Sequence, residues 1–156
     1  DNVTVPDRLK GIIHRCCEIK ADVVRKDEKE QDVRAILNYG HTFGHALERV
    51  TTYSTYVHGE AVAIGMHVAA VCGRKLGMCD DACVSRQHAL LTAAGLDTAV
   101  PACDVNEVMD AFRHDKKTRG NTLRFVLPRS IGEVDIVENP DAEILRETLL
   151  DCQSGT

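Results

Sequence analysis

Apolar residues recur along most of the chain with the spacing of an α-helix, which predicts a mainly helical protein. Residues 6–24 carry apolar side chains every three or four positions, as an amphipathic helix does. Residues 104–114 show inward apolar positions of the same kind and are predicted as a further helix. Acidic capping residues and Gly95 predict a helix over residues 81–94, and Asn139 with Pro140 predicts the start of the last helix, residues 140–151. Residues 58–76 are small and apolar on almost every side, so we expect this segment to form a buried central helix.

Glycine and polar residues separate these segments. Residues 38–40 predict a break between a short helical turn and a helix over residues 41–50. Residues 115–121 are predicted to form a charged turn. Alternating apolar and polar side chains then predict two strands, at residues 123–127 and 133–137, which pair as one small antiparallel hairpin.

Composition places the chain among ordinary globular proteins. Its 156 residues carry a formal net charge of −5 that is spread along the sequence, which argues against nucleic acid as a partner. The longest apolar run, residues 61–72, is too short and too polar to span a bilayer, so no membrane partner is expected. Seven cysteines without a CxxC pair indicate reduced thiols and a cytoplasmic protein. A metal pair at Cys79 and Cys83 is the weaker alternative, because no second pair lies nearby.

The sequence begins without a methionine and contains no strand–glycine-loop–helix unit that would bind a nucleotide. We therefore expect residues 1–156 to be a single helical domain that is a fragment of a longer protein.

Three of the seven histidines fall within residues 41–58, and this cluster is the main candidate for chemistry. His41 and His45 are four residues apart in a predicted helix, so their side chains lie on one face. His58 begins the next apolar segment. Neutral imidazole is a good zinc ligand, but an HxxxH pair alone favours an ordinary structural histidine. Glycines beside the histidines indicate tight packing or the close approach of a ligand. These glycines are Gly40, Gly44 and Gly59.

Two neighbouring motifs carry a resemblance to a known family. The first is Arg-x-x-x-Asn-Tyr-Gly-His-Thr-Phe-Gly-His-Ala-Leu-Glu at residues 34–48, and the second is His-Gly-Glu-Ala-Val-Ala-Ile-Gly-Met at residues 58–66. Together they resemble the C-terminal domain of 3-dehydroquinate synthase, one of the sugar phosphate cyclases. The similarity in order and spacing runs from about residue 8 to residue 147. It implies a mainly α, multihelical domain with one small antiparallel β-hairpin.

The resemblance also implies a reaction. Members of this family are NAD- and metal-dependent lyases of the shikimate pathway, which leads to chorismate and the aromatic amino acids. They convert 3-deoxy-D-arabino-heptulosonate 7-phosphate to 3-dehydroquinate and phosphate by transient oxidation, phosphate elimination and cyclisation. The implied cofactors are NAD and Zn²⁺ or Co²⁺. The implied partners are this sugar phosphate, an N-terminal NAD-binding domain and a second copy of the full-length protein in a homodimer. By the same resemblance, residues 1–156 are the domain that binds metal and substrate, the NAD-binding domain is absent from this sequence, and the isolated chain should be inactive because it holds only part of the active site.

The family's site residues match positions of this chain one by one. By resemblance, His41 and His58 are metal ligands, and the third family ligand is a glutamate that lies before this sequence begins. His45 resembles the histidine close to the substrate phosphate, with a role in proton transfer. The resemblance also implies substrate contacts, at Lys20, Arg34, Asn38 and one of Lys116 and Lys117. Lys20 and the acidic Glu30 are implied in catalysis as well.

Three other functions remain open. Sister cyclases, such as 2-deoxy-scyllo-inosose synthase and the enzymes that make valiolone precursors, use a similar metal and NAD site. Metal-dependent polyol dehydrogenases share the architecture, and a helical module that keeps the motif without activity is the non-enzyme alternative. Asn38 and His45 together favour the dehydroquinate reaction, because the elimination of phosphate needs donors beside the leaving group.

Overall fold

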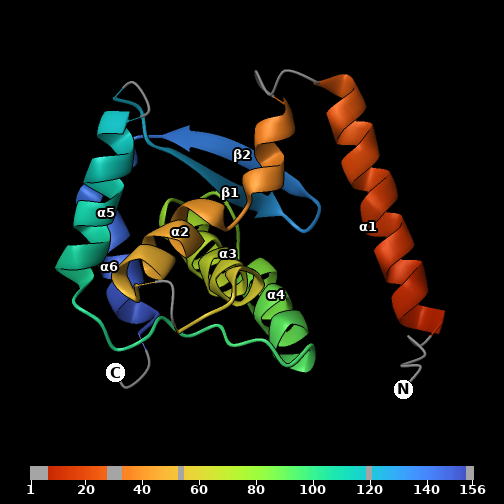
Figure 1. Ribbon diagram of the computed structural model, residues 1–156, viewed down its shortest axis with the longest axis horizontal. Coiled ribbons are helices and arrows are strands. Elements are labelled where there is room, and N and C mark those ends of the chain that lie inside the picture. Colours follow the sequence, from red (N-terminus) through yellow and green to blue (C-terminus); the bar gives the residue numbers. More distant parts are fainter. Residues whose placement is uncertain (1–6, 28–32, 53–54, 119–120, 154–156) are drawn as a thin grey trace. The chain divides into compact units, whose positions relative to one another are not determined.

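The first unit of the chain contains one long helix and one short helical turn. The computed structural model divides into two compact units, residues 1–37 and 38–156. In the first unit, α1 (Asp7–Lys26) confirms the predicted amphipathic helix, and Ile12 and Ile13 of its apolar stripe are exposed. The turn η1 (Val33–Asn38) is a 3-10 helix that leads into the second unit. The structure describes residues 7–27, 33–52, 55–118 and 121–153 (Figure 1).

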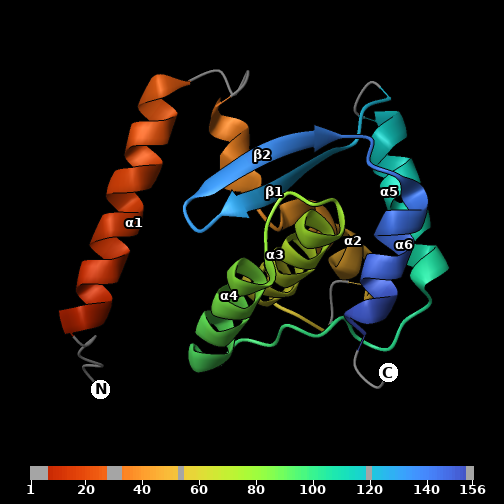
Figure 2. The same ribbon diagram turned by 180° about the vertical axis from the view of Figure 1, so that it is seen from behind.

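The helix α3 (His58–Lys75) is the centre of the second unit, as its apolar pattern predicts. It packs against α2 (His41–Val50), α4 (Asp81–Ala93) and α6 (Ala142–Asp151), and Figures 1 and 2 show these helices around it. The predicted bounds of all four helices agree with the observed ones within two residues. Despite the apolar character of α3, no helix in the described part of the chain is long and apolar enough to cross a membrane.

Glycines allow α2 and α3 to cross with their backbones in contact. Gly40 precedes α2 with a φ of 80°, a left-handed conformation that glycine adopts without strain. A Cβ atom on Gly65 of α3 would lie only 2.1 Å from the carbonyl oxygen of Gly40 and 2.7 Å from the amide nitrogen of Gly44. The expected close approach at these glycines is therefore made by a neighbouring helix backbone. Around Gly59, by contrast, a Cβ atom would meet nothing within 4 Å.

The strands β1 (Arg124–Ser130) and β2 (Glu133–Glu138) form the predicted antiparallel hairpin, each strand running slightly further than its pattern indicates. The register pairs Phe125 with Val137, and Gly132 in the connecting turn has a φ of 94°. One face of β1 packs on α3, so the hairpin lies across the helices and is anchored by its first strand (Figure 2).

The helix α5 (Val105–Thr118) is longer than predicted. The expected charged turn at residues 115–121 is wrong in its first half, because residues 115–118 continue the helix. Lys116 and Lys117 stand in the last helical turn, where positive side chains interact favourably with the helix dipole. Phe112 holds α5 in place, its ring centre 5.6 Å from that of Phe43 in α2 and 5.4 Å from that of Phe125 in β1.

Candidate metal and substrate site

The three motif histidines converge at the crossing of α2 and α3. His41 is the first residue of α2, His45 follows one turn later, and His58 is the first residue of α3. The ring centres lie 5.7 Å apart for His41 and His45, 5.3 Å for His41 and His58, and 5.4 Å for His45 and His58. The start of α3, and with it His58, is fixed by the Glu60 carboxylate, which accepts the amide proton of Val57 at 3.0 Å. The structure thus brings together all three predicted imidazoles.

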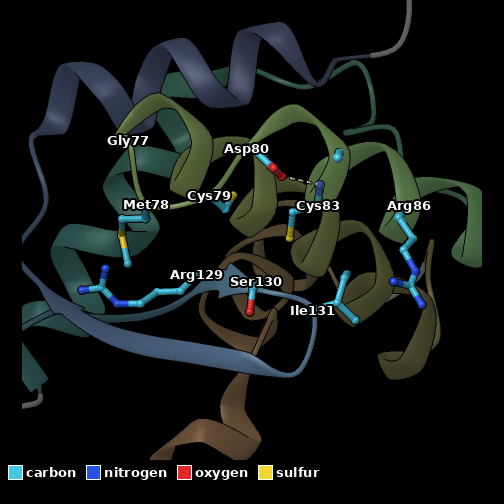
Figure 3. A pocket seen from close by; sticks show the side chains of 10 residues that line it. Gly77, Met78, Cys79, Asp80, Cys83, Arg86, Arg129, Ser130 and Ile131 are labelled. Carbon is cyan, nitrogen blue, oxygen red and sulfur yellow. Dashed lines mark hydrogen bonds between the residues drawn. The ribbon is translucent and has the colours of Figure 1, made fainter.

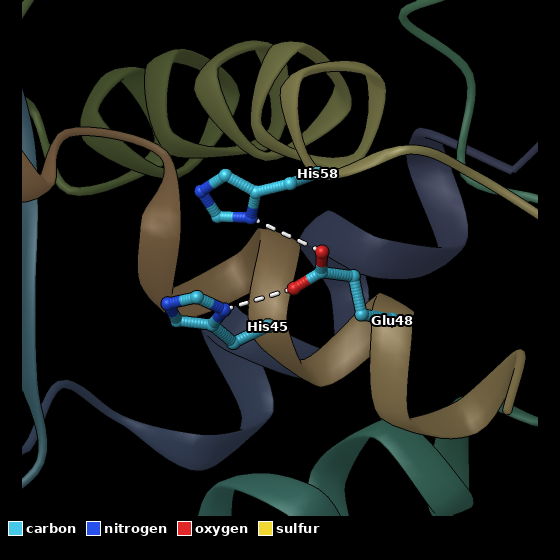
Figure 4. Close-up of side chains that lie close together, drawn as sticks. All are labelled: His45, Glu48 and His58. Atoms are coloured by element: carbon cyan, nitrogen blue, oxygen red, sulfur yellow. Dashed lines mark hydrogen bonds and ion pairs between the residues drawn. The ribbon is translucent and has the colours of Figure 1, made fainter. Parts of the chain in front are cut away.

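A buried acid joins two of these rings. Glu48 of α2 is 7% exposed, and its two carboxylate oxygens accept one hydrogen bond each. His45 donates from Nδ1 to Oε2 at 2.9 Å, and His58 donates from Nδ1 to Oε1 at 3.1 Å. Figure 4 shows the second nitrogen of each ring pointing away from the carboxylate. Sequence reasoning assigned Glu48 no role, although its place three residues after His45 and seven after His41 puts it on the same helix face.

His41 is oriented by the backbone. Its Nδ1 lies 3.2 Å from the carbonyl oxygen of Tyr39, which can only accept a hydrogen bond. Tyr39 is itself held, because its hydroxyl donates to Gln87 and lies 3.2 Å from the carbonyl oxygen of Met66, which also accepts from Gln87 at 2.9 Å. All three site histidines therefore donate from Nδ1, and in the neutral form of each ring the lone pair is on Nε2.

The electrostatics of Glu48 favour its charged form. Burial by itself raises the pKa of the Glu48 carboxyl, but the hydrogen bonds from His45 and His58 and the positive charge these rings can carry outweigh it. The net pKa of Glu48 lies below its ordinary value. At neutral pH the acid is a carboxylate, which requires both imidazoles to be donors.

The arrangement fits a zinc-type metal ion. Two imidazoles on one tetrahedral zinc have ring centres roughly 5 Å apart, because the Zn–N distance is about 2.0–2.1 Å. The observed 5.3 to 5.7 Å agree with this spacing for every pair in the cluster. Ligating histidines also donate their other ring N–H to a carboxylate or a carbonyl, as all three do here. The choice of His41 and His58 as the ligands stays a prediction from the family resemblance.

A second donor set overlaps this one. Ligand atoms of His45, Glu48 and His58 lie within 4.8 Å of one another, the one group of three such side chains found among the described residues. In this alternative the carboxylate itself would be a ligand. The ring nitrogens that face Glu48 are the Nδ1 atoms, however, and they are engaged in hydrogen bonds.

The predicted substrate residues are distributed over both units. Lys20 is exposed on α1 and Arg34 is half-buried in η1, so both belong to the first unit, and their place relative to the histidines stays a prediction. Glu30 lies outside the described residues. Asn38 is half-buried at the end of η1, three residues before His41. Lys116 is half-buried and Lys117 exposed at the end of α5.

A hollow elsewhere in the second unit is not the candidate site. It has a volume of about 640 Å³ and lies between the α3–α4 connection, α4 and the hairpin turn (Figure 3). Arg129 beside it already pairs with Asp135. Cys79 donates its thiol proton to the carbonyl of Ala70, and burial raises the pKa of this thiol to about 11, which disfavours the metal pair with Cys83.

Comparison with solved structures defines the class of protein. The fold is that of the sugar phosphate cyclases. A 2-deoxy-scyllo-inosose synthase, solved with carbaglucose-6-phosphate, NAD⁺ and Co²⁺, superposes with a TM-score of 0.82 and 27% identity over 97% of this chain and 44% of its own. A 2-epi-5-epi-valiolone synthase from Streptomyces hygroscopicus, solved with NAD⁺ and Zn²⁺ bound, superposes with a TM-score of 0.83. It is 22% identical, over 94% of this chain and 41% of its own length.

The sequence comparisons identify the family. Residues 2–118 match the family model described as 3-dehydroquinate synthase C-terminal, and the chain belongs to this family. The 3-dehydroquinate synthase of Nostoc punctiforme is 46% identical over 145 residues, which are 92% of this chain and 40% of that protein. Those of two Neisseria meningitidis strains are 45% identical over 143 residues, with the same coverage. The chain thus spans about 40% of the length of the relatives it matches.

Proposed function

We propose that the protein is a 3-dehydroquinate synthase, a lyase that converts 3-deoxy-D-arabino-heptulosonate 7-phosphate to 3-dehydroquinate and phosphate. In this proposal the chain is the metal- and substrate-binding domain, and the NAD-binding domain lies elsewhere in the protein. The observation that carries the proposal is the cluster of His41, His45 and His58, each of which donates from Nδ1 and presents Nε2. The identity of about 45% to named synthases supports this reaction over that of the sister cyclases, which are 22–27% identical.

His41 and His58 would hold a divalent metal ion, Zn²⁺ or Co²⁺, together with a third ligand from outside this sequence. When bound, the metal ion would supply Lewis-acid polarisation of the hydroxyl group that is oxidised, and NAD⁺ would supply reversible hydride transfer. The fold neighbour solved with NAD⁺ and Co²⁺ at 27% identity supports both cofactors. The Nε2 lone pairs of the two ligating histidines are fixed before the metal binds, which reduces the reorganisation that binding requires.

His45 would act on the substrate rather than on the metal. Its side chain is 54% exposed and its ring is nearly parallel to that of His58, at an interplanar angle of 22°. In this role Nε2 of His45 would face the leaving phosphate, where it would accept or release a proton. Asn38, at the end of η1, would donate to the same end of the substrate.

The cationic side chains would position a substrate that carries both a carboxylate and a phosphate. Lys20 and Arg34 are proposed contacts on the first unit, and Glu30 is the proposed acid at the site. Of the two lysines of α5, Lys116 is the better candidate for a substrate contact. It is half-buried and follows Phe112 by four residues, so it lies on the face of α5 that packs on α2, whereas Lys117 is exposed.

The test is to incubate the complete protein with NAD⁺, Zn²⁺ and 3-deoxy-D-arabino-heptulosonate 7-phosphate and to measure phosphate release and 3-dehydroquinate separately. Both products should form in equal amounts. Addition of a chelator should stop the reaction, and excess Zn²⁺ should restore it. A parallel reaction with glucose 6-phosphate tests the sister activity of the neighbour that binds a glucose 6-phosphate analogue. Turnover of glucose 6-phosphate without formation of 3-dehydroquinate would replace the proposed function with that of an inosose synthase.

A further inference from the structure

Glu48 has no role in the proposed reaction so far, although it is the acid on which the histidine cluster is built. Its side chain is 9% exposed, whereas the side chains of His45 and His58 are both 54% exposed. A carboxylate removed from water is costly unless its oxygens are satisfied by hydrogen bonds. Each oxygen here is satisfied by a different imidazole, one from α2 and one from α3.

The chemistry of the groups fixes where the protons are. A carboxylate has only acceptor atoms, so a hydrogen bond to each ring requires that the ring nitrogen carries the proton. Nδ1 of His45 and Nδ1 of His58 must both be N–H. In a neutral imidazole the other nitrogen, Nε2, is then a lone-pair donor. One buried acid therefore selects the tautomer of two exposed rings at once.

We propose that Glu48 is a positioning residue that fixes the Nδ1–H tautomers of His45 and His58, so that Nε2 of His58 faces the metal ion and Nε2 of His45 faces the substrate. The assignment of those two targets rests on the proposed function, whereas the tautomers rest on the hydrogen bonds alone. Because a single carboxylate holds both rings, with their centres 5.4 Å apart, it also keeps the metal ligand and the substrate histidine at one separation.

The competing role for Glu48 is that of a direct metal ligand, together with His45 and His58. The two roles use opposite nitrogens of His58. A positioning carboxylate leaves Nδ1 protonated after the metal binds and places the metal on Nε2. A ligating carboxylate removes the Nδ1 protons, because the metal then occupies the space between the rings and the acid.

The experiment is a set of long-range ¹H–¹⁵N correlation spectra that identify the protonated nitrogen of each histidine. The complete protein is labelled with ¹⁵N-histidine and measured at about pH 8, above the reference histidine pKa of about 6.5. Signals are assigned with His45→Gln and His58→Gln. Without metal, both rings should show Nδ1–H. After Zn²⁺ is added, the Nε2 signal of His58 should shift and its Nδ1–H should persist.

Glu48→Gln supplies the matched perturbation. A glutamine side chain has one acceptor oxygen and one donor nitrogen, so it can accept from one Nδ1–H but donates to the other ring. At least one of the two histidines should therefore change to the Nε2–H tautomer. Zn²⁺ affinity, measured by competition with a chelating dye, should fall by about 10–100-fold, the usual effect of removing such a partner. Glu107→Gln removes the same charge from an exposed position on α5 and should change neither result.

The wild-type spectra decide the inference even if Glu48→Gln fails to fold. Nε2–H tautomers on both rings of the wild-type chain would overturn it, as would loss of the His58 Nδ1–H when Zn²⁺ binds. A folded Glu48→Gln variant with unchanged tautomers and affinity would also overturn it. If wild-type spectra show Nδ1–H on both rings but Zn²⁺ does not bind the complete protein, the positioning of the rings stands and the proposed function fails.

Discussion

The substitution Gly65→Ala tests whether the crossing of α2 and α3 is as close as the structure has it. An alanine Cβ would stand 2.1 Å from the carbonyl oxygen of Gly40 and 2.7 Å from the amide nitrogen of Gly44. Those two atoms form the first hydrogen bond of α2, at 2.9 Å. Ordinary contacts begin at about 3.4 Å, so the helices must separate by roughly 1 Å or the hydrogen bond must break.

The expected loss in the free energy of unfolding follows from two destabilising effects and one stabilising effect. Overpacking typically costs about 1–3 kcal/mol, and a contact between backbones belongs at the upper end because neither side can change rotamer. Damage to the hydrogen bond adds about 1 kcal/mol. Alanine recovers about 0.8–1.0 kcal/mol of helix propensity. We therefore expect the free energy of unfolding to fall by roughly 2–3 kcal/mol.

Urea unfolding followed by circular dichroism measures this loss, and Zn²⁺ affinity measures its effect on the site. Gly59→Ala is the matched control, because it lies on the same helix with nothing within 4 Å of its Cβ position. The control should change the stability by less than about 1 kcal/mol. If Gly65→Ala were as stable as the control and bound Zn²⁺ as tightly as the wild type, the crossing described here would be wrong.

The remaining predictions concern two site histidines, a helix cap and a buried ring. His58→Gln should abolish tight Zn²⁺ binding to the complete protein while His45→Gln keeps it within about tenfold, as read by competition with a dye; equal losses would contradict the division of roles. Asp80→Ala removes the N-terminal cap of α4, whose carboxylate accepts the Cys83 amide proton at 2.8 Å. The free energy of unfolding measured in urea should fall by about 1 kcal/mol. An unchanged free energy of unfolding would show that the cap does not stabilise α4. Burial, and secondarily nearby positive charge, lower the pKa of His67, so the unfolded chain binds a proton at this residue more readily than the folded chain. The contribution of His67 to the free energy of unfolding is therefore present above about pH 6.5, the pKa of an unfolded histidine, and is lost as the pH falls below it. His67→Gln should flatten the dependence of Tm on pH in this range.

The positions of most helices could be predicted from the sequence, because apolar periodicity and glycine breaks are properties of short segments. The apolar pattern of residues 58–76 and the break at Gly40 are properties of short segments, and both agree with α3 and with the start of α2. The predicted end of α5 was wrong because charged residues such as Lys116 and Lys117 are typical both of turns and of last helical turns. Nothing in their local sequence distinguishes the two states.

The candidate site was predictable in part. His41 and His45 share a helix face through their spacing, and that spacing alone brings their rings together. The approach of His58 depends on how α3 packs on α2, which no local pattern specifies. Glu48 was missed for the same reason, since its second hydrogen bond crosses to the other helix. An acid at the same face as two histidines was the signal that could have indicated it.

The close crossing and the buried acid are two parts of one arrangement. Packed helices usually lie about 8–10 Å apart, a distance set by the side chains between them. Glu48 is on α2 and His58 is on α3, so a direct 3.1 Å hydrogen bond between them requires helices that approach closely beside it. Gly44 and Gly65 make that approach possible, although each costs about 0.8–1.0 kcal/mol of helix propensity relative to alanine. The glycines therefore act on the histidines through geometry. A variant such as Gly65→Ala should loosen the pairing of Glu48 with His58 more than its pairing with His45, because His45 lies on the same helix as the acid and moves with it.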